Sequence, residues 1–268
     1  SQLYKSSWSQ SEDYTPNTTA INQINTNMED YTQIKTSGKF MALSCTHGNL
    51  MDEAAFAYFM KEKKAYKPKH MIHLGDAFEF TALRKGATED EKRIDIEEDI
   101  EWGLWALQEM MEGIKGERWF LRGNHCERLW EMAQKGSTVG RDFAKMHIAR
   151  IEEFLGDMKI KTKPYCSTQG VIQINDLLAM HGYGFGVNAA KDHMKVYHKS
   201  LMFGHTHRAE SAIGTGWPYP IEALNVGMMM NKFPKYASRT TSVLSWTHGF
   251  AKGEFHKDGT HSKELVTI

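Results

Sequence analysis

The sequence of 268 residues has little of several features that define particular classes of protein. It has three cysteines and six prolines, and its 33 Lys and Arg residues balance its 33 Asp and Glu residues. So few cysteines exclude a secreted disulfide framework and favour a reducing, cytoplasmic compartment. The balanced charge disfavours a protein whose sole task is to hold nucleic acid or an anionic membrane. The longest apolar run extends only from Ala54 to Met60, which is too short to span a bilayer.

What the chain does contain is an ordinary share of hydrophobic residues, 41%, and 13 histidines. A chain of this length and composition buries a core without disulfides. Residues 1–37 are rich in Ser, Thr, Asn and Gln and show little periodicity, so we predict an N-terminal polar arm there. For residues 38–268 we predict a single domain.

Strand and helix patterns alternate after this arm. Apolar runs at 39–44, 70–74 and 118–121 predict buried strands, and the segments 50–64 and 96–114 predict helices between them. This order is typical of βαβ units with a parallel sheet. A helical region then extends to about residue 155, and short strand-like pieces follow, including 242–246. The acidic residues within 88–101 are predicted to form a solvated helix face.

Polar side chains follow several of these predicted strands, at the point where each strand ends. The carboxyl ends of strands meet at one edge of an open α/β sheet, where ligands bind. A mixture of imidazole, carboxylate and amide groups suits Zn, Mn, Fe or Ni better than Ca or Mg. The candidate metal-binding or catalytic residues are His47, Asp76, Asn124, His125, His181, His205 and His207.

The order of these residues resembles the motif pattern of the calcineurin-like metallophosphoesterases. That pattern reads Asp-x-His, Gly-Asp, Gly-Asn-His-Asp/Glu, His and Gly-His-x-His. The resemblance spans about residues 40–210 and implies a four-layer α-β-β-α sandwich of two mixed β-sheets flanked by helices. The matching blocks are Cys45-Thr46-His47, Gly75-Asp76, Gly123-Asn124-His125-Cys126, His181 and Gly204-His205-Thr206-His207.

The resemblance also implies a binuclear centre of two divalent or trivalent transition metal ions (Mn, Zn, Fe or Ni). Asp76 would bridge the two ions and is therefore expected to be essential for catalysis. A hydroxide shared by the ions would attack the phosphate. One ion would be bound by Cys45, His47 and His207, and the other by Asn124, His181 and His205.

The expected activity is hydrolysis of a phosphate mono- or diester whose identity the sequence does not reveal. His125 matches the catalytic histidine of the family, which contacts the phosphoryl oxygen or protonates the leaving group. Asn124, His125 and Arg128 are the predicted substrate-binding residues, since an arginine fork matches phosphate geometry. One alternative is a nuclease that acts on DNA or RNA through the same centre.

Two cysteines depart from the family pattern. Cys45 replaces the first acid, and either its thiolate binds Zn or Fe in place of a carboxylate, or the first metal site is weak or empty. Cys126 replaces the acid that supports the catalytic histidine, and Glu127 is displaced by one residue from that position. A second alternative is therefore a binding or scaffold protein of the same fold whose metal centre is impaired.

Overall fold

Strand β2 (Gly38–Leu43) of the computed structural model is apolar on both faces, as a strand between two packed layers must be. Phe40 and Ala42 belong to a core between the two sheets. Met41 and Leu43 belong to a core between one sheet and its helices. Because the two sets alternate with a period of two, all four residues from Phe40 to Leu43 are hydrophobic.

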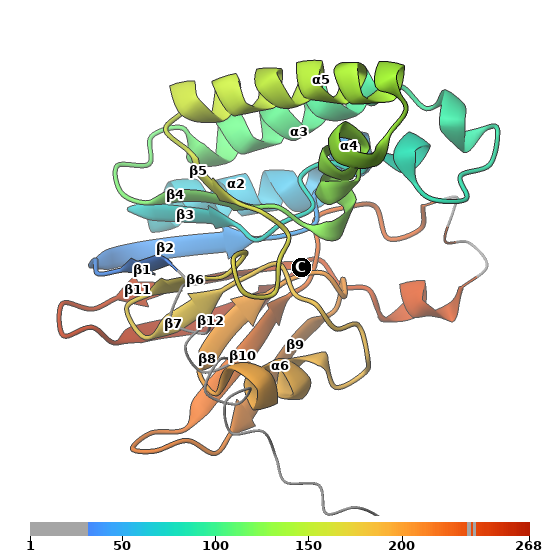
Figure 1. Ribbon diagram of the computed structural model, residues 1–268. Helices are drawn as coiled ribbons and strands as arrows, with labels where there is room; N and C mark the ends of the chain where they lie inside the picture. The colour runs from blue at the N-terminus through green and yellow to red at the C-terminus, as the bar shows by residue number, and fades with distance from the viewer. Residues whose placement is uncertain (1–31, 235–236, 238–239) are drawn as a thin grey trace, which may run out of the picture. The chain divides into compact units, whose positions relative to one another are not determined.

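The first sheet has the order β12-β11-β2-β3-β4-β5. Its central strands are parallel, with Ala42 opposite Ile72 and Ile72 opposite Trp119, whereas β11 runs antiparallel to β2. Helices α2, α3 and α5 cover the outer face of this sheet (Figure 1). The bounds are β3 His70–His73, β4 Arg118–Leu121, β5 Lys161–Lys163, β11 Gly249–Phe255, β12 His261–Thr267, α2 Glu53–Tyr66, α3 Ile96–Met111 and α5 Thr138–Asp157.

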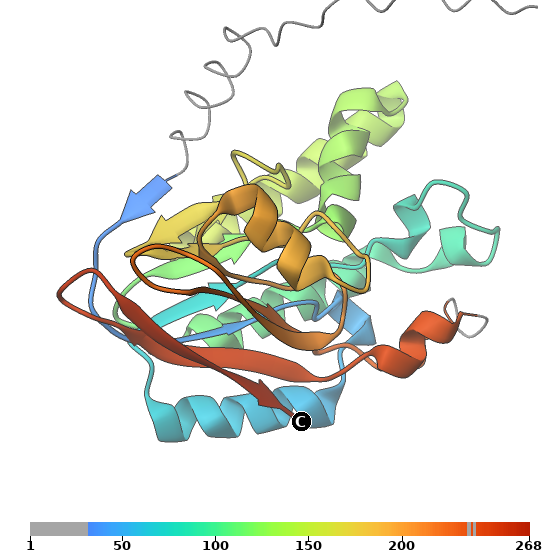
Figure 2. The same cartoon turned by 90° about the horizontal axis from the view of Figure 1, so that it is seen from below.

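The second sheet has the order β1-β6-β7-β8-β10-β9 and is also mixed. Strands β7, β8 and β10 are parallel, and β9 runs antiparallel to β10. Helix α6 (Ala189–Tyr197) lies across the outer face of this sheet (Figure 2), where it packs on Leu201 and Phe203 of β8. The remaining strands are β1 Thr32–Ile34, β6 Ile172–Ile174, β7 Leu177–Ala179, β8 Ser200–Phe203, β9 Ala209–Gly214 and β10 Ile221–Val226.

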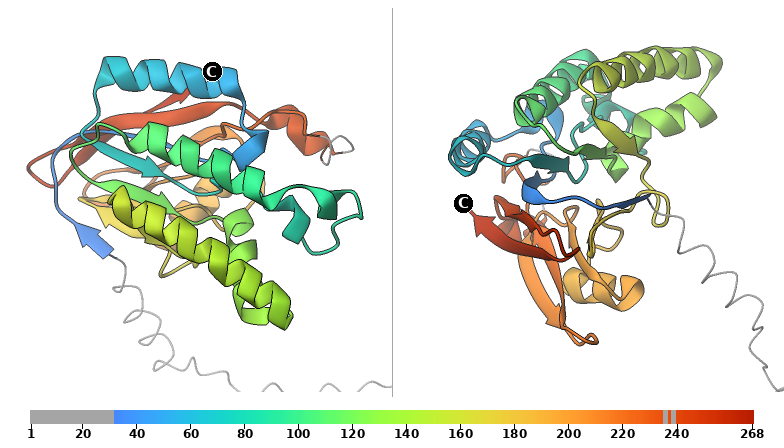
Figure 3. Two further views of the ribbon diagram at one scale, coloured as in Figure 1. Left: turned by 90° about the horizontal axis from the view of Figure 1, so that it is seen from above. Right: turned by 90° about the vertical axis from the view of Figure 1, so that its left-hand side faces the viewer.

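Residues 32–234, 237 and 240–268 are the ones that the structure describes. Within them the layers follow one another as helices, sheet, sheet and helix (Figure 3), which confirms the four-layer sandwich that the sequence predicts. Most of the predicted polar arm, residues 1–31, lies outside the described residues, and β1 occupies part of the remainder. No helix in the described part of the chain combines the length and hydrophobicity needed to cross a membrane.

Two segments differ from the sequence-based expectation. The helical region after β4 consists of two helices, α4 (Asn124–Lys135) and α5, with a break at Gly136. The strand predicted at 242–246 is wrong, because a 3₁₀ helix, η5 (Thr241–Ser245), lies there. The hydroxyls of Thr240 and Ser245 donate to nearby backbone carbonyls. Such local bonds compete with the hydrogen bonds of a sheet.

Candidate metal centre

The predicted ligands lie in the loops that follow β2, β3 and β4 of one sheet and β7 and β8 of the other. These loops are joined through their backbones: Cys45 and His47 donate N–H bonds to the carbonyls of Gly75 and Asp76, at 2.8 and 2.9 Å. Five non-glycine residues of this region, each at a predicted ligand position, have left-handed φ angles between 53° and 68°. Backbone strain of this kind clusters at functional sites and persists only where the surroundings enforce it. The five are Cys45, His47, Asp76, His205 and His207.

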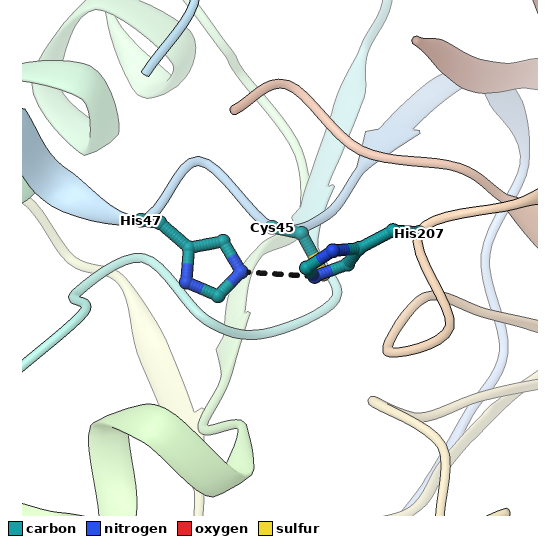
Figure 4. Close-up of side chains that lie close together, drawn as sticks. All are labelled: Cys45, His47 and His207. Carbon is teal, nitrogen blue, oxygen red and sulfur yellow. Dashed lines mark hydrogen bonds between the residues drawn. The ribbon is translucent and has the colours of Figure 1, made fainter. Parts of the chain in front are cut away.

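The first predicted group of ligands converges as expected (Figure 4). The ligand atoms of Cys45, His47 and His207 all lie within 4.8 Å of one another. The Nε2 atoms of the two imidazoles face each other at 3.1 Å. His47 Nδ1 contacts Glu79 Oε2 at 2.5 Å, which orients the ring with Nε2 toward the group. Burial and the neighbouring His47 hold the pKa of His207 well below its ordinary value, so His207 is in the neutral form that binds metals.

The second predicted group also comes together. Asn124 Oδ1 lies 3.1 Å from His181 Nε2 and 2.9 Å from His205 Nδ1. His181 Nδ1 donates to the carbonyl of Leu74 at 3.0 Å, so the lone pair of Nε2 points into the group. Burial, reinforced by His181, lowers the pKa of His205 to about 3. In the tautomer of neutral His205 that carries its proton on Nε2, Nδ1 is an acceptor. Three acceptor atoms then face one another, which is the arrangement that a cation stabilises.

Asp76 lies between the two groups. Its Oδ2 is 3.1 Å from His181 Nε2 and 4.0 Å from His47 Nε2. Burial by itself would raise the pKa of this carboxyl, but His181 and His125 outweigh burial and hold the pKa well below its ordinary value. The same oxygen, Oδ2, thus faces both groups, while Oδ1 accepts the backbone N–H of His125 at 2.9 Å. An ionised carboxylate oxygen between two groups of ligand atoms suits a bridging ligand. The donor set thus fits two transition metal ions.

Close packing at Asp76 depends on two glycines. A Cβ atom at Gly123 would lie 2.1 Å from Asp76 Oδ1, and one at Gly75 would lie 2.2 Å from His181 Nδ1. Any larger residue at either position would displace a predicted ligand. The glycines that flank the motifs are therefore required by the geometry of the candidate site.

Cys45 is fully buried, and its Sγ is 3.2 Å from the hydroxyl of Ser44. Burial and the negative charge of Asp76 raise the pKa of the thiol well above its ordinary value. A bound metal ion is the influence that deprotonates such a thiol outright. The sulfur occupies the position where the first group needs its third ligand, as the first of the two interpretations of Cys45 requires.

The partner of His125 is Glu79, which the sequence analysis missed. Glu79 Oε2 accepts a bond from His125 Nδ1 at 2.9 Å, and Thr81 donates to Oε1 at 2.8 Å. Burial by itself would lower the pKa of His125, but Glu79 and Asp76 outweigh it and raise the pKa. Glu127 points elsewhere, with Oε2 3.6 Å from Arg122 Nε. The signal in the sequence was a carboxylate three residues after Asp76 in the same loop.

Asp99 was also missed, and it is the buried exception to the predicted solvated acidic face, whose other acids are exposed or partly exposed. Its side chain is 2% exposed and accepts N–H bonds from Glu79 and Phe80. Burial outweighs these two donors and raises the pKa of Asp99 to about 7. Asp99 thus fixes the backbone of the loop that carries Glu79, whereas Glu97 and Glu98 of the same helix remain exposed.

Arg128, a predicted substrate-binding residue, lies beside His125 on the first turns of α4. Its NH1 group donates to the carbonyl of Glu79 at 2.8 Å, and its NH2 group is 3.5 Å from His125 Nε2. The side chains of Arg128 and His125 are each 17% exposed. Both groups are therefore accessible at the edge of the site while their inner contacts are fixed.

Comparisons with known proteins give distant structural similarities only. No protein-family model matches the sequence, and no curated protein matches it. Solved structures with a similar chain trace include Vps29 of Entamoeba histolytica complexed with zinc, with 13% identity, coverage of 85% of this chain and 98% of that one, and a TM-score of 0.41. The phosphoesterase YfcE of E. coli has 16% identity, coverage of 86% of this chain and 99% of that one, and a TM-score of 0.38. The cold-active protein-tyrosine phosphatase of a Shewanella species has 13% identity, coverage of 86% of this chain and 81% of that one, and a TM-score of 0.38.

Proposed function

We propose that this chain is a metal-dependent phosphoesterase that hydrolyses a phosphate mono- or diester. The observation that carries the proposal is the convergence of two donor groups on Asp76, with the His125–Glu79 pair at the edge of the same site. Pairs of titratable groups with strongly shifted pKa values in a buried cluster are typical of catalytic sites. The calcineurin-like motif order of the sequence supports the same activity.

The ligands divide into two sets with Asp76 common to both. Metal ions at these sets would lower the pKa of bound water and stabilise negative charge on the phosphate. A thiolate and several imidazoles favour Zn or Fe over Mn, because thiolates are soft ligands. The first set is Cys45, His47 and His207, and the second is Asn124, His181 and His205.

His125 is the group we assign to proton transfer. Its Nδ1–H donates to Glu79, so its Nε2 is directed to the side of the ring where Arg128 lies. In the protonated form, Nε2–H donates to a phosphoryl oxygen or passes its proton to the departing oxygen of the ester. The guanidinium of Arg128 adds positive charge at the same place and attracts the phosphate group.

The test is turnover of p-nitrophenyl phosphate and bis(p-nitrophenyl) phosphate with Mn, with Zn and with a chelator. We expect metal-dependent release of p-nitrophenol, and loss of turnover in Asp76→Asn. Asp258→Asn, which changes an exposed loop carboxylate in the same way, is the matched control and should remain fully active.

Three outcomes would change the assignment. Turnover that a chelator does not affect would refute the metal mechanism. Metal bound in stoichiometric amount without turnover of either ester would identify a binding protein instead of an enzyme. Cleavage of an oligonucleotide much faster than of either nitrophenyl ester, and strongly inhibited by salt, would identify the nuclease alternative.

A further inference from the structure

A hollow of about 680 Å³ opens next to the candidate metal centre, between α4 and the segment that carries η2 (Thr81–Leu83). These two parts of the chain lie side by side (Figure 1). A volume of this size is typical of sites that bind small organic molecules. The lining residues are Ala82, Leu83, Arg84, Lys85, Asn124, Arg128, Glu131, Met132, Lys135 and Gly136.

Four of the lining side chains are cationic, and Glu131 is the one carboxylate among them. Arg84 pairs with Glu91 at 2.7 Å and Lys135 with Glu131 at 3.4 Å. Both cations are substantially exposed, at 42% and 73%, and exposed ion pairs of this kind are weak enough for an anionic ligand to replace them. Lys85 has no ion-pair partner within the described residues. Arg128 faces Glu79 at 3.5 Å. Three of the four cations are thus paired with a carboxylate, and Lys85 leaves the hollow with an excess of positive charge.

Arg128 connects the hollow to the side of His125 that faces away from Glu79. Arg128 lines the hollow, and its NH2 group is 3.5 Å from His125 Nε2. Asn124 lines it as well, and its Oδ1 belongs to the second donor group. A group that protonates the departing oxygen must lie next to that oxygen, within hydrogen-bond distance. If His125 is that group, the part of the substrate that departs lies over the hollow.

We propose that the hollow binds the leaving group of the substrate and that this leaving group carries a phosphate of its own. The proposal rests on the proposed function and names its substrate class. A bond forms from water oxygen to phosphorus, the bond from phosphorus to the ester oxygen breaks, and the proton of His125 goes to that oxygen. Arg84 and Lys85 hold the second phosphate, and Leu83 contacts the uncharged part that joins the two phosphates.

The experiment compares two probes with the same scissile bond. Adenosine 5′-monophosphate has an uncharged leaving group, whereas adenosine 3′,5′-bisphosphate leaves as adenosine 3′-phosphate. With metal added, we expect kcat/KM to favour the bisphosphate by about tenfold or more, as two or three close charges in partly exposed positions provide. The double variant Arg84→Ala/Lys85→Ala should reduce this preference about tenfold. Lys145→Ala, an exposed lysine of α5 outside the hollow, should leave it unchanged.

Calorimetric binding of the bisphosphate to the protein gives a second measurement that does not require turnover. Its affinity should fall about tenfold in the double variant and not in Lys145→Ala. A 5′-phosphorylated decathymidylate as a third ligand distinguishes a nucleic-acid strand from a free nucleotide as the source of the second phosphate. Circular dichroism verifies that each variant is folded.

The outcomes separate this proposal from the function on which it rests. If no metal supports turnover of the nitrophenyl esters, the phosphoesterase function is refuted. Binding of the bisphosphate that the double variant weakens would then still support an anion site in the hollow. The opposite result is also informative. If the nitrophenyl esters are turned over but the double variant leaves the preference and affinity for the bisphosphate unaltered, the hollow is not the leaving-group site.

Discussion

Replacing Glu79 by glutamine removes one negative charge from the candidate site and keeps the shape of the side chain. The amide oxygen can occupy the position of Oε2 and accept from both His47 Nδ1 and His125 Nδ1, as the carboxylate does. The amide NH2 group then takes the position of Oε1, where the hydroxyl of Thr81 can turn to accept instead of donating. The variant therefore tests the charge of Glu79 separately from the orientation of the two imidazoles.

The magnitude follows from the strength of the bond to His125. A hydrogen bond to a charged group contributes roughly 1.5–3 kcal/mol, and a neutral one about 1 kcal/mol. Glu79 is 4% exposed, so solvent screens this difference very little. A loss of roughly 0.5–2 kcal/mol in transition-state stabilisation lowers kcat/KM by roughly 2- to 30-fold.

The pH profile provides the sharper measurement. Glu79 raises the pKa of His125, so the protonated imidazole persists to higher pH than it would alone. Without the charge this pKa falls, and activity that needs the protonated imidazole is lost at lower pH. The alkaline limb of kcat/KM for p-nitrophenyl phosphate should therefore shift to lower pH in Glu79→Gln.

Glu127→Gln is the matched control, because Glu127 lies next to Cys126 in the sequence but contacts Arg122 and the backbone of Tyr165. Its pH profile should coincide with that of the parent protein. An unchanged alkaline limb in Glu79→Gln, or the same shift in both variants, would refute the role assigned to Glu79. Metal content measured on both variants excludes ligand loss as the cause.

Three further predictions concern the metal, the pH dependence of stability and the packing of one loop. Cys45→Asp should shift bound metal from Zn or Fe toward Mn, measured by elemental analysis after growth in mixed metals, and an unaltered metal content would contradict the thiolate-ligand interpretation. Asp99 holds its proton up to a pKa of about 7 in the folded protein but only to an ordinary aspartate pKa when unfolded, so its contribution to stability is present at low pH and is lost as the pH rises. The lowered pKa values of buried histidines such as His73 and His205 make stability rise over the same range, so the quantity to compare is the difference between the two proteins. In urea unfolding between pH 4 and 7, the free energy of unfolding of the parent minus that of Asp99→Asn should fall by about 1 kcal/mol per pH unit. Gly48→Ala should destabilise the protein by roughly 2–3 kcal/mol in the same assay, because the residue has a φ of 51° and its Cβ would lie 1.7 Å from Asp99 Oδ1. A loss of stability below about 0.5 kcal/mol would show that the loop relaxes around the new side chain.

Local sequence signals identified the strands that bracket the candidate site. Gly-flanked polar residues after apolar runs mark β2, β3 and β4, because a buried strand must be apolar and must end where its loop reaches solvent. The strand predicted at 242–246 is wrong although the segment contains Val243, Leu244 and Trp246, because hydroxyl-to-carbonyl bonds of Thr240 and Ser245 favour a short 3₁₀ helix. The residues of strand β12, at the edge of its sheet, are half-buried or exposed. The strand therefore lacks the buried apolar pattern that predicts an internal strand.

The spacing of residues within the motif does not identify the carboxylate that contacts His125. The family pattern directs attention to the residue after His125, where this chain has Cys126, fully buried with a pKa that burial and Asp76 raise to about 12. The carboxylate that contacts His125 comes from another loop, at Glu79, and Asp99 of α3 fixes that loop from behind. No local pattern distinguishes Asp99 from the exposed acids beside it, since its burial arises from the way α3 packs over the loop.

The sequence by itself determined the alternation of strands and helices and the side chains that follow each strand, because both depend on the periodicity of apolar residues. The four-layer sandwich was implied by the resemblance of its motif order to a known family. Only the tertiary structure decided which of those side chains meet. His47 and His207 are far apart in the chain, yet their Nε2 atoms lie 3.1 Å apart across the two sheets. The same packing gave His125 its carboxylate partner and placed the cationic hollow beside it. Distances between atoms of different loops depend on how whole layers pack, so the residue pattern within one segment does not specify them.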